Sequence, residues 1–247
     1  VPGDGLIVHR HAVPAIEDTL AMGCWTPTAS FGIGSQAGAD WRAELLAADG
    51  TAFRLHRSAG ATLDIQWTQC GLHNVENALA AMAAAQHVGV AAEVSAEALL
   101  AFKGVKRRLE LLGVVDEIAI YDDFAHHPTA IATTLQGLRA RTGHGRLLAL
   151  IEPRSNTMRM GEHREQLAAA TAAADQIYWF QPPGMDWSLD DVISQSPSPA
   201  HLASDIDQLV AAVAAEARPG DQVVIMSNGS FGGIHQKLLM QLEHAHG

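Results

Sequence analysis

The chain has 247 residues, of which 48% are hydrophobic and 17% charged. This is enough apolar material for one large core or two smaller ones, and it excludes a disordered chain. The formal net charge of −11 would repel nucleic-acid phosphate from most of the surface, so we expect no nucleic-acid partner. Cys24 and Cys70 are the only cysteines, which fits a reducing cytoplasm, and no apolar run approaches the ~20 residues of a membrane span.

The first hundred residues combine strand-like and helical patterns. Short apolar runs lie between Cys24 and Trp67, and those at 53–56 and 63–67 alternate at period two, which predicts an antiparallel sheet. Alanine favours helix, so the alanine-rich stretch over 77–87 predicts one helix, and the pattern over 95–102 predicts a second.

From residue 103 onward, strand candidates alternate with helical stretches. This alternation predicts an α/β fold with a Rossmann-like, mostly parallel sheet. The strands are expected at 118–121, 146–151, 176–180 and 222–226, and the helices at 129–141, 163–173, 204–217 and 234–244. Gly104 can act as a hinge between the two patterns, so we expect two units, 1–102 and 103–247.

Two polar motifs lie before the predicted parallel sheet. Asn74 and Asn77 are three residues apart near a helix start, so they share a helix face and could bind an adenine edge; helix capping is the alternative. The second motif, 103–110, is a cationic cluster in an acidic protein. An arginine here could bind phosphate, or the segment could be an ordinary solvated charge run.

A third motif, 121–129, follows a predicted strand and precedes a helix, where ligands bind in parallel α/β sheets. His126 and His127 are neighbours in an extended segment and point to opposite faces, so they would chelate one metal poorly. An aspartate that accepts from ribose hydroxyls, or a histidine near phosphates, fits the turn better, and we assign no metal ligand to this chain.

Two further motifs end predicted strands. In 152–161, Arg154 and Arg159 flank hydroxyl and amide donors, a composition suited to carboxylates, although a capped loop is the alternative. In 226–235, three glycines let the backbone approach a ligand closely at a helix start. Both motifs are expected at the same edge of the sheet and would form one continuous pocket.

Taken together, these five motifs resemble the Mur ligase family of ATP-dependent amide ligases. The resemblance spans most of 71–247, and the sequences at 152–158 and 226–235 resemble the members that act in cell-wall recycling. It implies that residues 1–102 are the end of a central ATP-binding domain and that 103–247 form the C-terminal domain. It also implies a cytoplasmic ligase that joins UDP-N-acetylmuramate to the tripeptide L-Ala-γ-D-Glu-meso-diaminopimelate with ATP and Mg²⁺.

The resemblance also implies a role for each motif. ATP would phosphorylate the muramate carboxylate, and the peptide amine would then displace phosphate. The adenine would contact Asn77, His73 and Asn74; the ribose, Asp123; and the ATP phosphates, Arg108. His126 and His127 would line the same cleft. The substrate-binding residues implied for the incoming peptide, which would orient it more than transfer protons, are Arg154, Ser155, Asn156, Thr157, Ser227, Asn228 and Gly229.

The phosphate loop G-x-x-G-K-[ST] does not occur in the sequence. We therefore expect this loop, most Mg²⁺ ligands and a UDP-binding unit to lie upstream in a longer protein, and the present chain alone to be inactive. Three alternatives remain: a stand-alone nucleotide- or peptide-binding module, a related ligase with another amine acceptor, and a metal-dependent hydrolase built on the 13 histidines, for which no HExxH pattern exists.

Overall fold

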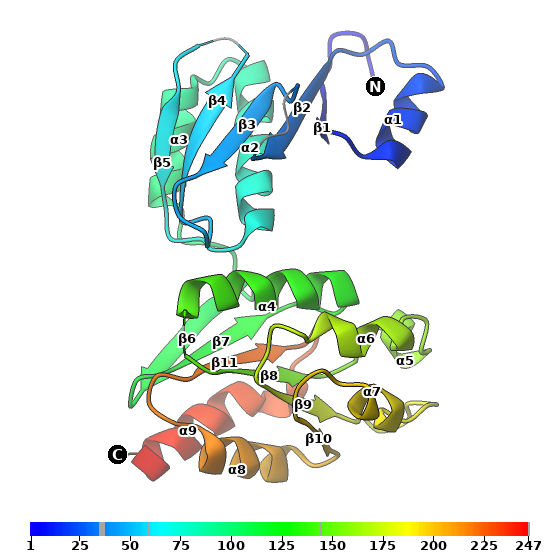
Figure 1. The fold of residues 1–247 in the computed structure, drawn as a ribbon, viewed down its shortest axis with the longest axis vertical. Coiled ribbons are helices and arrows are strands. Elements are labelled where there is room, and N and C mark those ends of the chain that lie inside the picture. The colour runs from blue at the N-terminus through cyan, green and yellow to red at the C-terminus, as the bar shows by residue number, and fades with distance from the viewer. Residues whose placement is uncertain (35–37, 59, 144, 247) are drawn as a thin grey trace. The chain divides into compact units, whose positions relative to one another are not determined.

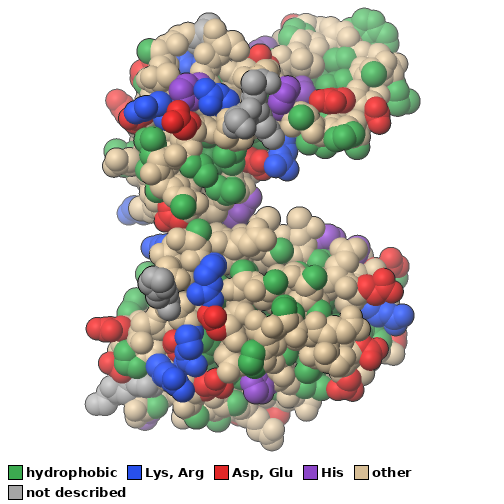
Figure 2. Space-filling model, viewed as in Figure 1, with side chains coloured by type: hydrophobic (Ala, Val, Ile, Leu, Met, Phe, Trp, Pro, Cys, Tyr) green, Lys and Arg blue, Asp and Glu red, His purple; other side chains and the backbone are tan. Residues whose placement is uncertain are grey.

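The computed structural model describes residues 1–34, 38–58, 60–143 and 145–246. The chain forms two compact units, Val1–Lys103 and Gly104–Gly247. Each unit has its own sheet; the first unit has one hydrophobic core and the second has one on each face of its sheet. On the face in Figure 2, Lys and Arg side chains lie beside Asp and Glu side chains on both units. No helix among the described residues is long and apolar enough to span a membrane.

The first unit is built on a five-stranded sheet in the order β1-β2-β3-β4-β5. Its strands are β1 (Ile7–Arg10), β2 (Thr28–Ile33), β3 (Trp41–Leu45), β4 (Ala52–Arg57) and β5 (Leu63–Gln66). The prediction of an antiparallel sheet is correct for β3, β4 and β5 but wrong for β2, which pairs in parallel with β1 and β3. Helix α1 (Pro14–Ala21) forms a crossover between β1 and β2, which allows these two strands to pair in parallel.

Two helices cover one face of this sheet (Figure 1). They are α2 (Leu72–His87) and α3 (Ala92–Ala101). Helix α2 turns Val75, Leu79 and Met82 toward the sheet, at the three- and four-residue spacing of a helix face. These side chains pack in one cluster with Phe53 and Leu55 of β4. The polar residues at the start of α2 are therefore placed by a well-packed helix.

The second unit is a doubly covered sheet in the order β10-β9-β8-β11-β7-β6. Five of its strands are mutually parallel: β7 (Ile118–Asp123), β8 (Leu147–Ile151), β9 (Gln176–Phe180), β10 (Ala200–Ala203) and β11 (Gln222–Met226). The edge strand β6 (Glu110–Val115) runs antiparallel to β7. The α/β prediction is confirmed; β6 and β10 are absent from the strands expected from the sequence.

Helices lie on both faces of this second sheet (Figure 1). One face carries α4 (Pro128–Thr142), α5 (Asn156–Arg159), α6 (Arg164–Ala170) and α7 (Asp190–Ser194); the other carries α8 (Ile206–Glu216), the short 3₁₀ helix η1 (Phe231–Gly233) and α9 (Ile234–His246).

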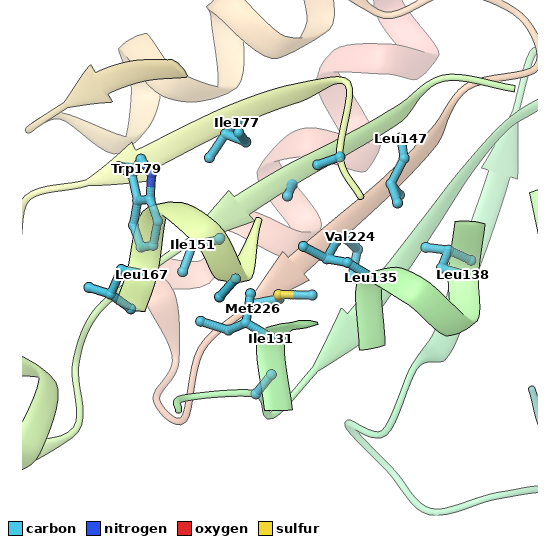
Figure 3. Packing of buried hydrophobic residues seen from close by; sticks show 14 of the residues in the cluster. Ile131, Leu135, Leu138, Leu147, Ile151, Leu167, Ile177, Trp179, Val224 and Met226 are labelled. Atoms are coloured by element: carbon cyan, nitrogen blue, oxygen red, sulfur yellow. The ribbon is translucent and has the colours of Figure 1, made fainter. Parts of the chain in front are cut away.

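The central strand β11 contributes to both cores of the second unit. Val224 and Met226 face the first helical layer, whose packing against Ile131 and Leu135 of α4 is visible in Figure 3. The alternate residues of β11 face the opposite layer. Strands buried on both faces read as continuous apolar runs, which is why their positions are visible in the sequence.

Candidate functional site

Three neighbouring strands of the second unit, β8, β11 and β7, end level with one another. In the sheet register, Met226 of β11 pairs with Asp123 of β7 on one side and with Ile151 of β8 on the other. The segments that follow these residues therefore leave the sheet side by side at its carboxyl edge, which is where parallel α/β sheets bind ligands. The motifs 121–129, 152–161 and 226–235 meet there, and direct contacts join them.

Ser227 holds the loop after β11 in place. Its hydroxyl donates to Glu152 Oε2 over 2.5 Å and accepts from the Gly229 amide over 2.9 Å. Ser227 is 0% exposed and Glu152 is 6% exposed, so this hydroxyl has no free face for a ligand. The prediction that the Ser227 hydroxyl contacts the peptide is therefore corrected. The buried hydroxyl instead fixes the conformation of the loop after β11.

Arg154 lies across Gly229. A Cβ atom built on Gly229 would come within 2.4 Å of Arg154 Cδ and 2.6 Å of Arg154 Nη1. A Cβ at this position would therefore force the Arg154 side chain to move. The Arg154 side chain is 49% exposed, and Glu152 Oε1 lies 3.9 Å from its Nη1. An exposed guanidinium with one distant ion-pair partner still has N–H groups that can donate to a ligand carboxylate.

The segment after Arg154 exposes further polar groups. Ser155 is the N-cap of α5, and its hydroxyl donates to the His126 carbonyl over 3.3 Å. Asn156 and Thr157 are exposed beside it. Asn228 lies on the neighbouring loop, and its buried Oδ1 has no hydrogen-bond partner among the described residues. Hydroxyl and amide side chains therefore follow Arg154 in the chain and lie on the loop whose Gly229 packs against Arg154.

Trp187 stabilises the end of α5, although it lies outside the sequence motifs. Its indole N–H donates to the carbonyls of Met158 over 3.1 Å and Arg159 over 3.0 Å. Arg159 in turn donates to the Gly184 carbonyl over 2.8 Å. Arg159 is thereby tied to the loop after β9, which leaves Arg154 as the available cation of the pair. A tryptophan in a polar loop was the only sequence signal for this support.

The two arginines of the 103–110 motif have different surroundings. Arg107 donates to the Ser227 and Gly229 carbonyls over 2.6 and 2.7 Å and to Asp122 Oδ2 over 3.2 Å. Arg108 is exposed, and its guanidinium lies 5.3 Å from the Phe124 ring centroid. No carboxylate in the described part of the chain lies within ion-pair distance of Arg108. Arg108 is therefore the arginine that remains open to a phosphate.

Asp123 fastens the turn that carries Arg108. One carboxylate oxygen accepts from the Leu109 amide over 2.8 Å, and the other accepts from the Ala125 amide over 2.8 Å and the Thr134 hydroxyl over 3.3 Å. The residue is 4% exposed, and burial raises the pKa of its carboxyl, against the lowering effect of these hydrogen bonds. A carboxylate has roughly four acceptor positions, so about one remains for a ribose hydroxyl.

The adjacent histidines can now be told apart. His127 is the N-cap of α4, and its Nδ1 accepts from the Thr129 amide over 3.2 Å. Its ring packs edge-on against His163 at 4.5 Å between centroids. His126 Nδ1 lies 2.8 Å from the Phe124 carbonyl, which is an acceptor, so Nδ1 donates this hydrogen bond and Nε2 is left outside it.

The polar start of α2 lies in the first unit. Gly71 is the N-cap, so capping by an asparagine is not what places these residues. Asn74 Nδ2 donates to the Cys70 carbonyl over 2.7 Å, while its Oδ1 stays available. Asn77 is exposed, and no described residue forms a hydrogen bond with its side chain. The His73 ring lies against Gly71, where a Cβ would come within 2.7 Å of its Cε1. Within the described ranges, no group of three or more His, Cys, Asp or Glu could hold a metal ion.

Known proteins match this chain along nearly its whole length. The family model "Mur ligase, glutamate ligase domain" matches residues 107–229. The UDP-N-acetylmuramate–L-alanyl-γ-D-glutamyl-meso-2,6-diaminoheptandioate ligase of Haemophilus influenzae is 42% identical over 244 residues, which are 98% of this chain and 53% of that protein. A UDP-N-acetylmuramate–L-alanine ligase of Mycolicibacterium vanbaalenii is 31% identical over 196 residues, 76% of this chain and 41% of that protein.

A solved structure shares the fold. The murein peptide ligase of Psychrobacter arcticus is 44% identical, with a TM-score of 0.74, over 98% of this chain and 52% of that one. The chain thus spans about half the length of the relatives that cover it almost completely. With 42% identity across 98% of its length and a family match that begins at the Arg107 turn and ends at Gly229, the chain belongs to the Mur ligase family.

Proposed function

We propose that this chain is part of an ATP-dependent ligase that joins UDP-N-acetylmuramate to L-Ala-γ-D-Glu-meso-diaminopimelate, a reaction that reuses cell-wall peptide. The observation that carries the proposal is the exposed Arg154, which the exposed Asn156 and Thr157 follow at the carboxyl edge of the sheet. The relatives with this acceptor in their names match at 42% identity, against 31% for a relative named for L-alanine.

The second unit would bind the incoming tripeptide. A tripeptide of this kind is rich in carboxylates, and Arg154 offers a planar, permanently charged fork for one of them. Asn156 and Thr157 would add neutral hydrogen bonds, and Ser155 would fix the helix end that presents them. Orientation of the peptide amine, rather than proton transfer, is the contribution of these groups.

Two sets of residues are proposed for ATP, each on its own unit. In the first unit, the exposed Asn77 amide, with Asn74 Oδ1 and the His73 ring beside it, suits an adenine edge. In the second unit, Arg108 suits the phosphates and Asp123 has about one acceptor position left for ribose. His126 would offer Nε2, whereas His127 caps α4.

ATP supplies the phosphoryl group that activates the muramate carboxylate, and the peptide amine then displaces phosphate to form the amide. The residues of this chain would hold the reactants and stabilise negative charge during these steps. Mg²⁺ would accompany the nucleotide, and we propose no ligand for it among the residues described.

Calorimetric titration of the chain with the tripeptide tests the peptide site. We expect binding of the diaminopimelate tripeptide, weaker binding when lysine replaces diaminopimelate, and about tenfold or greater loss of affinity in Arg154→Ala. The matched control is Arg141→Ala, which removes an exposed arginine at the opposite end of α4 and should leave the affinity unchanged. Equal affinities in all three proteins would contradict the proposal.

A further inference from the structure

The sequence motif 103–110 presents two adjacent arginines, and the proposed phosphate site uses only Arg108. Arg107 is half-buried, with 33% of its side chain exposed, and its Nη2 bonds two carbonyl groups of the loop after β11. A guanidinium that already donates to two carbonyls and a carboxylate has few donors left for a phosphate. The contacts of Arg107 therefore indicate a role other than phosphate binding.

The loop that Arg107 holds is the loop on which Arg154 lies. Arg107 Nη2 bonds the Gly229 carbonyl at 2.7 Å, while the Arg154 side chain occupies the space next to the Gly229 Cα. Gly229 therefore contacts both guanidinium groups. A shift of this residue by even a fraction of an ångström would move the surface against which Arg154 packs.

Arg107 is itself held firmly. Its backbone has φ of 60°, in the left-handed region that side chains seldom adopt. Its amide donates to Glu110 Oε2 over 2.8 Å, and its carbonyl accepts from the Phe124 amide over 2.8 Å. Its guanidinium also lies 5.2 Å from the Phe124 ring centroid. These backbone and side-chain contacts maintain a backbone conformation that is unfavourable by itself.

A buried acidic group completes the arrangement. Asp122 Oδ2 accepts from Arg107 Nε, and Asp122 Oδ1 lies 3.1 Å from His235 Nε2, although the angles there are not those of a hydrogen bond. His235 lies in the first turn of α9, directly after the same loop. Both ends of the segment from 227 to 235 therefore contact one Asp122–Arg107 pair.

We propose that Arg107 is a positioning residue of the peptide site: it fixes the backbone of residues 227–229 so that Arg154 is held where the tripeptide carboxylate binds. This inference rests on the proposed function for its ligand but not for its geometry. The adjacent arginines would then serve different substrates, Arg108 the nucleotide phosphates and Arg107, through the loop, the peptide.

The test compares Arg107→Ala, Arg107→Lys and the control Arg141→Ala by titration with the diaminopimelate tripeptide. We expect about tenfold or greater loss of affinity in Arg107→Ala, because charge-assisted hydrogen bonds to two carbonyls are lost. Arg107→Lys should recover little, because an ammonium group cannot reproduce the planar fork that spans two carbonyls and a carboxylate. Arg141→Ala, an exposed position at the far end of α4, should keep the wild-type affinity. Unchanged affinity in Arg107→Ala would overturn the inference.

An NMR measurement on the ligand-free chain separates this inference from the proposed function. In Arg107→Ala, the amide signals of residues 228–230 and the Arg154 Nε–H signal should shift, while the signals of β9 stay in place. If the wild-type chain binds no tripeptide, the proposed function fails, and these shifts still decide the role of Arg107. An Arg154 Nε–H signal that is identical in both proteins would refute that role.

Discussion

Replacement of Ser227 by alanine isolates the buried hydroxyl that joins two loops of the site. The Ser227 hydroxyl donates to Glu152 Oε2 at 2.5 Å and accepts from the Gly229 amide at 2.9 Å. Alanine keeps the Cβ and creates almost no cavity. The perturbation is therefore the loss of one buried hydrogen bond to Glu152 and one partly buried hydrogen bond from Gly229.

The expected magnitude follows from burial and charge. A hydrogen bond to a charged group contributes about 1.5 to 3 kcal/mol, and a buried polar group left without a partner costs about 1 to 3 kcal/mol. Glu152 is 6% exposed, so water can replace little of the hydrogen bond that its carboxylate loses. The Gly229 amide is only partly buried, so water can replace more of its lost hydrogen bond. We therefore expect Ser227→Ala to lower the free energy of unfolding of the second unit by about 2 to 4 kcal/mol.

Ser188 provides a matched control on the surface. Its hydroxyl donates to Asp190 Oδ2 at 2.5 Å and accepts from the Asp190 amide at 3.2 Å, the same pair of bonds in an exposed loop. Because water replaces both bonds, Ser188→Ala should cost less than about 1 kcal/mol. The two variants differ mainly in burial.

Amide hydrogen exchange of β11 in increasing urea measures these losses. A strand-specific probe is needed because a chain with two units need not unfold in a single transition. The strand lies in the core of the second unit, so its amides report the unfolding of that unit alone. Equal losses in Ser227→Ala and Ser188→Ala would refute the reasoning, because burial would then not set the magnitude.

Three further predictions concern single contacts. Gly229→Ala places a Cβ where Arg154 lies, so tripeptide affinity in calorimetry should fall about tenfold or more, while urea unfolding changes little because Arg154 is flexible. Trp187→Phe removes the indole donor to the end of α5, so the amides of 156–160 should exchange several times faster, at a cost of about 1 kcal/mol, while those of β9 stay unchanged. Burial raises the pKa of Glu76, although the positive charge of Arg10 lowers it in part. As the pH rises above 4.5, Glu76 therefore loses its proton in the unfolded chain before it does so in the folded chain, and the first unit loses stability. Glu76→Gln should flatten that slope in urea titrations between pH 4 and 7, followed by exchange of β3 amides, and an unchanged slope would contradict the assignment.

Much of the second unit could be predicted from the sequence. The strand at Gln222–Met226 and the helix that starts at Ile234 agree with their predicted starts because strands buried on both faces are continuous apolar runs and helices repeat at three or four residues. The edge strands β6 and β10 were missed. Leu111 and Val114 of β6 are half or more exposed, so burial leaves no clear pattern in that strand.

Only the tertiary structure decided which strands are neighbours and which polar groups are free. The place of β11 between β7 and β8 depends on packing between segments that lie 75 and 103 residues apart in the chain, which local periodicity does not encode. The motif 103–110 contains two arginines. In the folded chain Arg107 donates to the Ser227 and Gly229 carbonyls, whereas the Arg108 side chain stays exposed. The sequence alone indicates which residue types meet at the sheet edge. Which of them are exposed and which hold the loops follows from hydrogen bonds between distant segments, and these exist only in the folded chain.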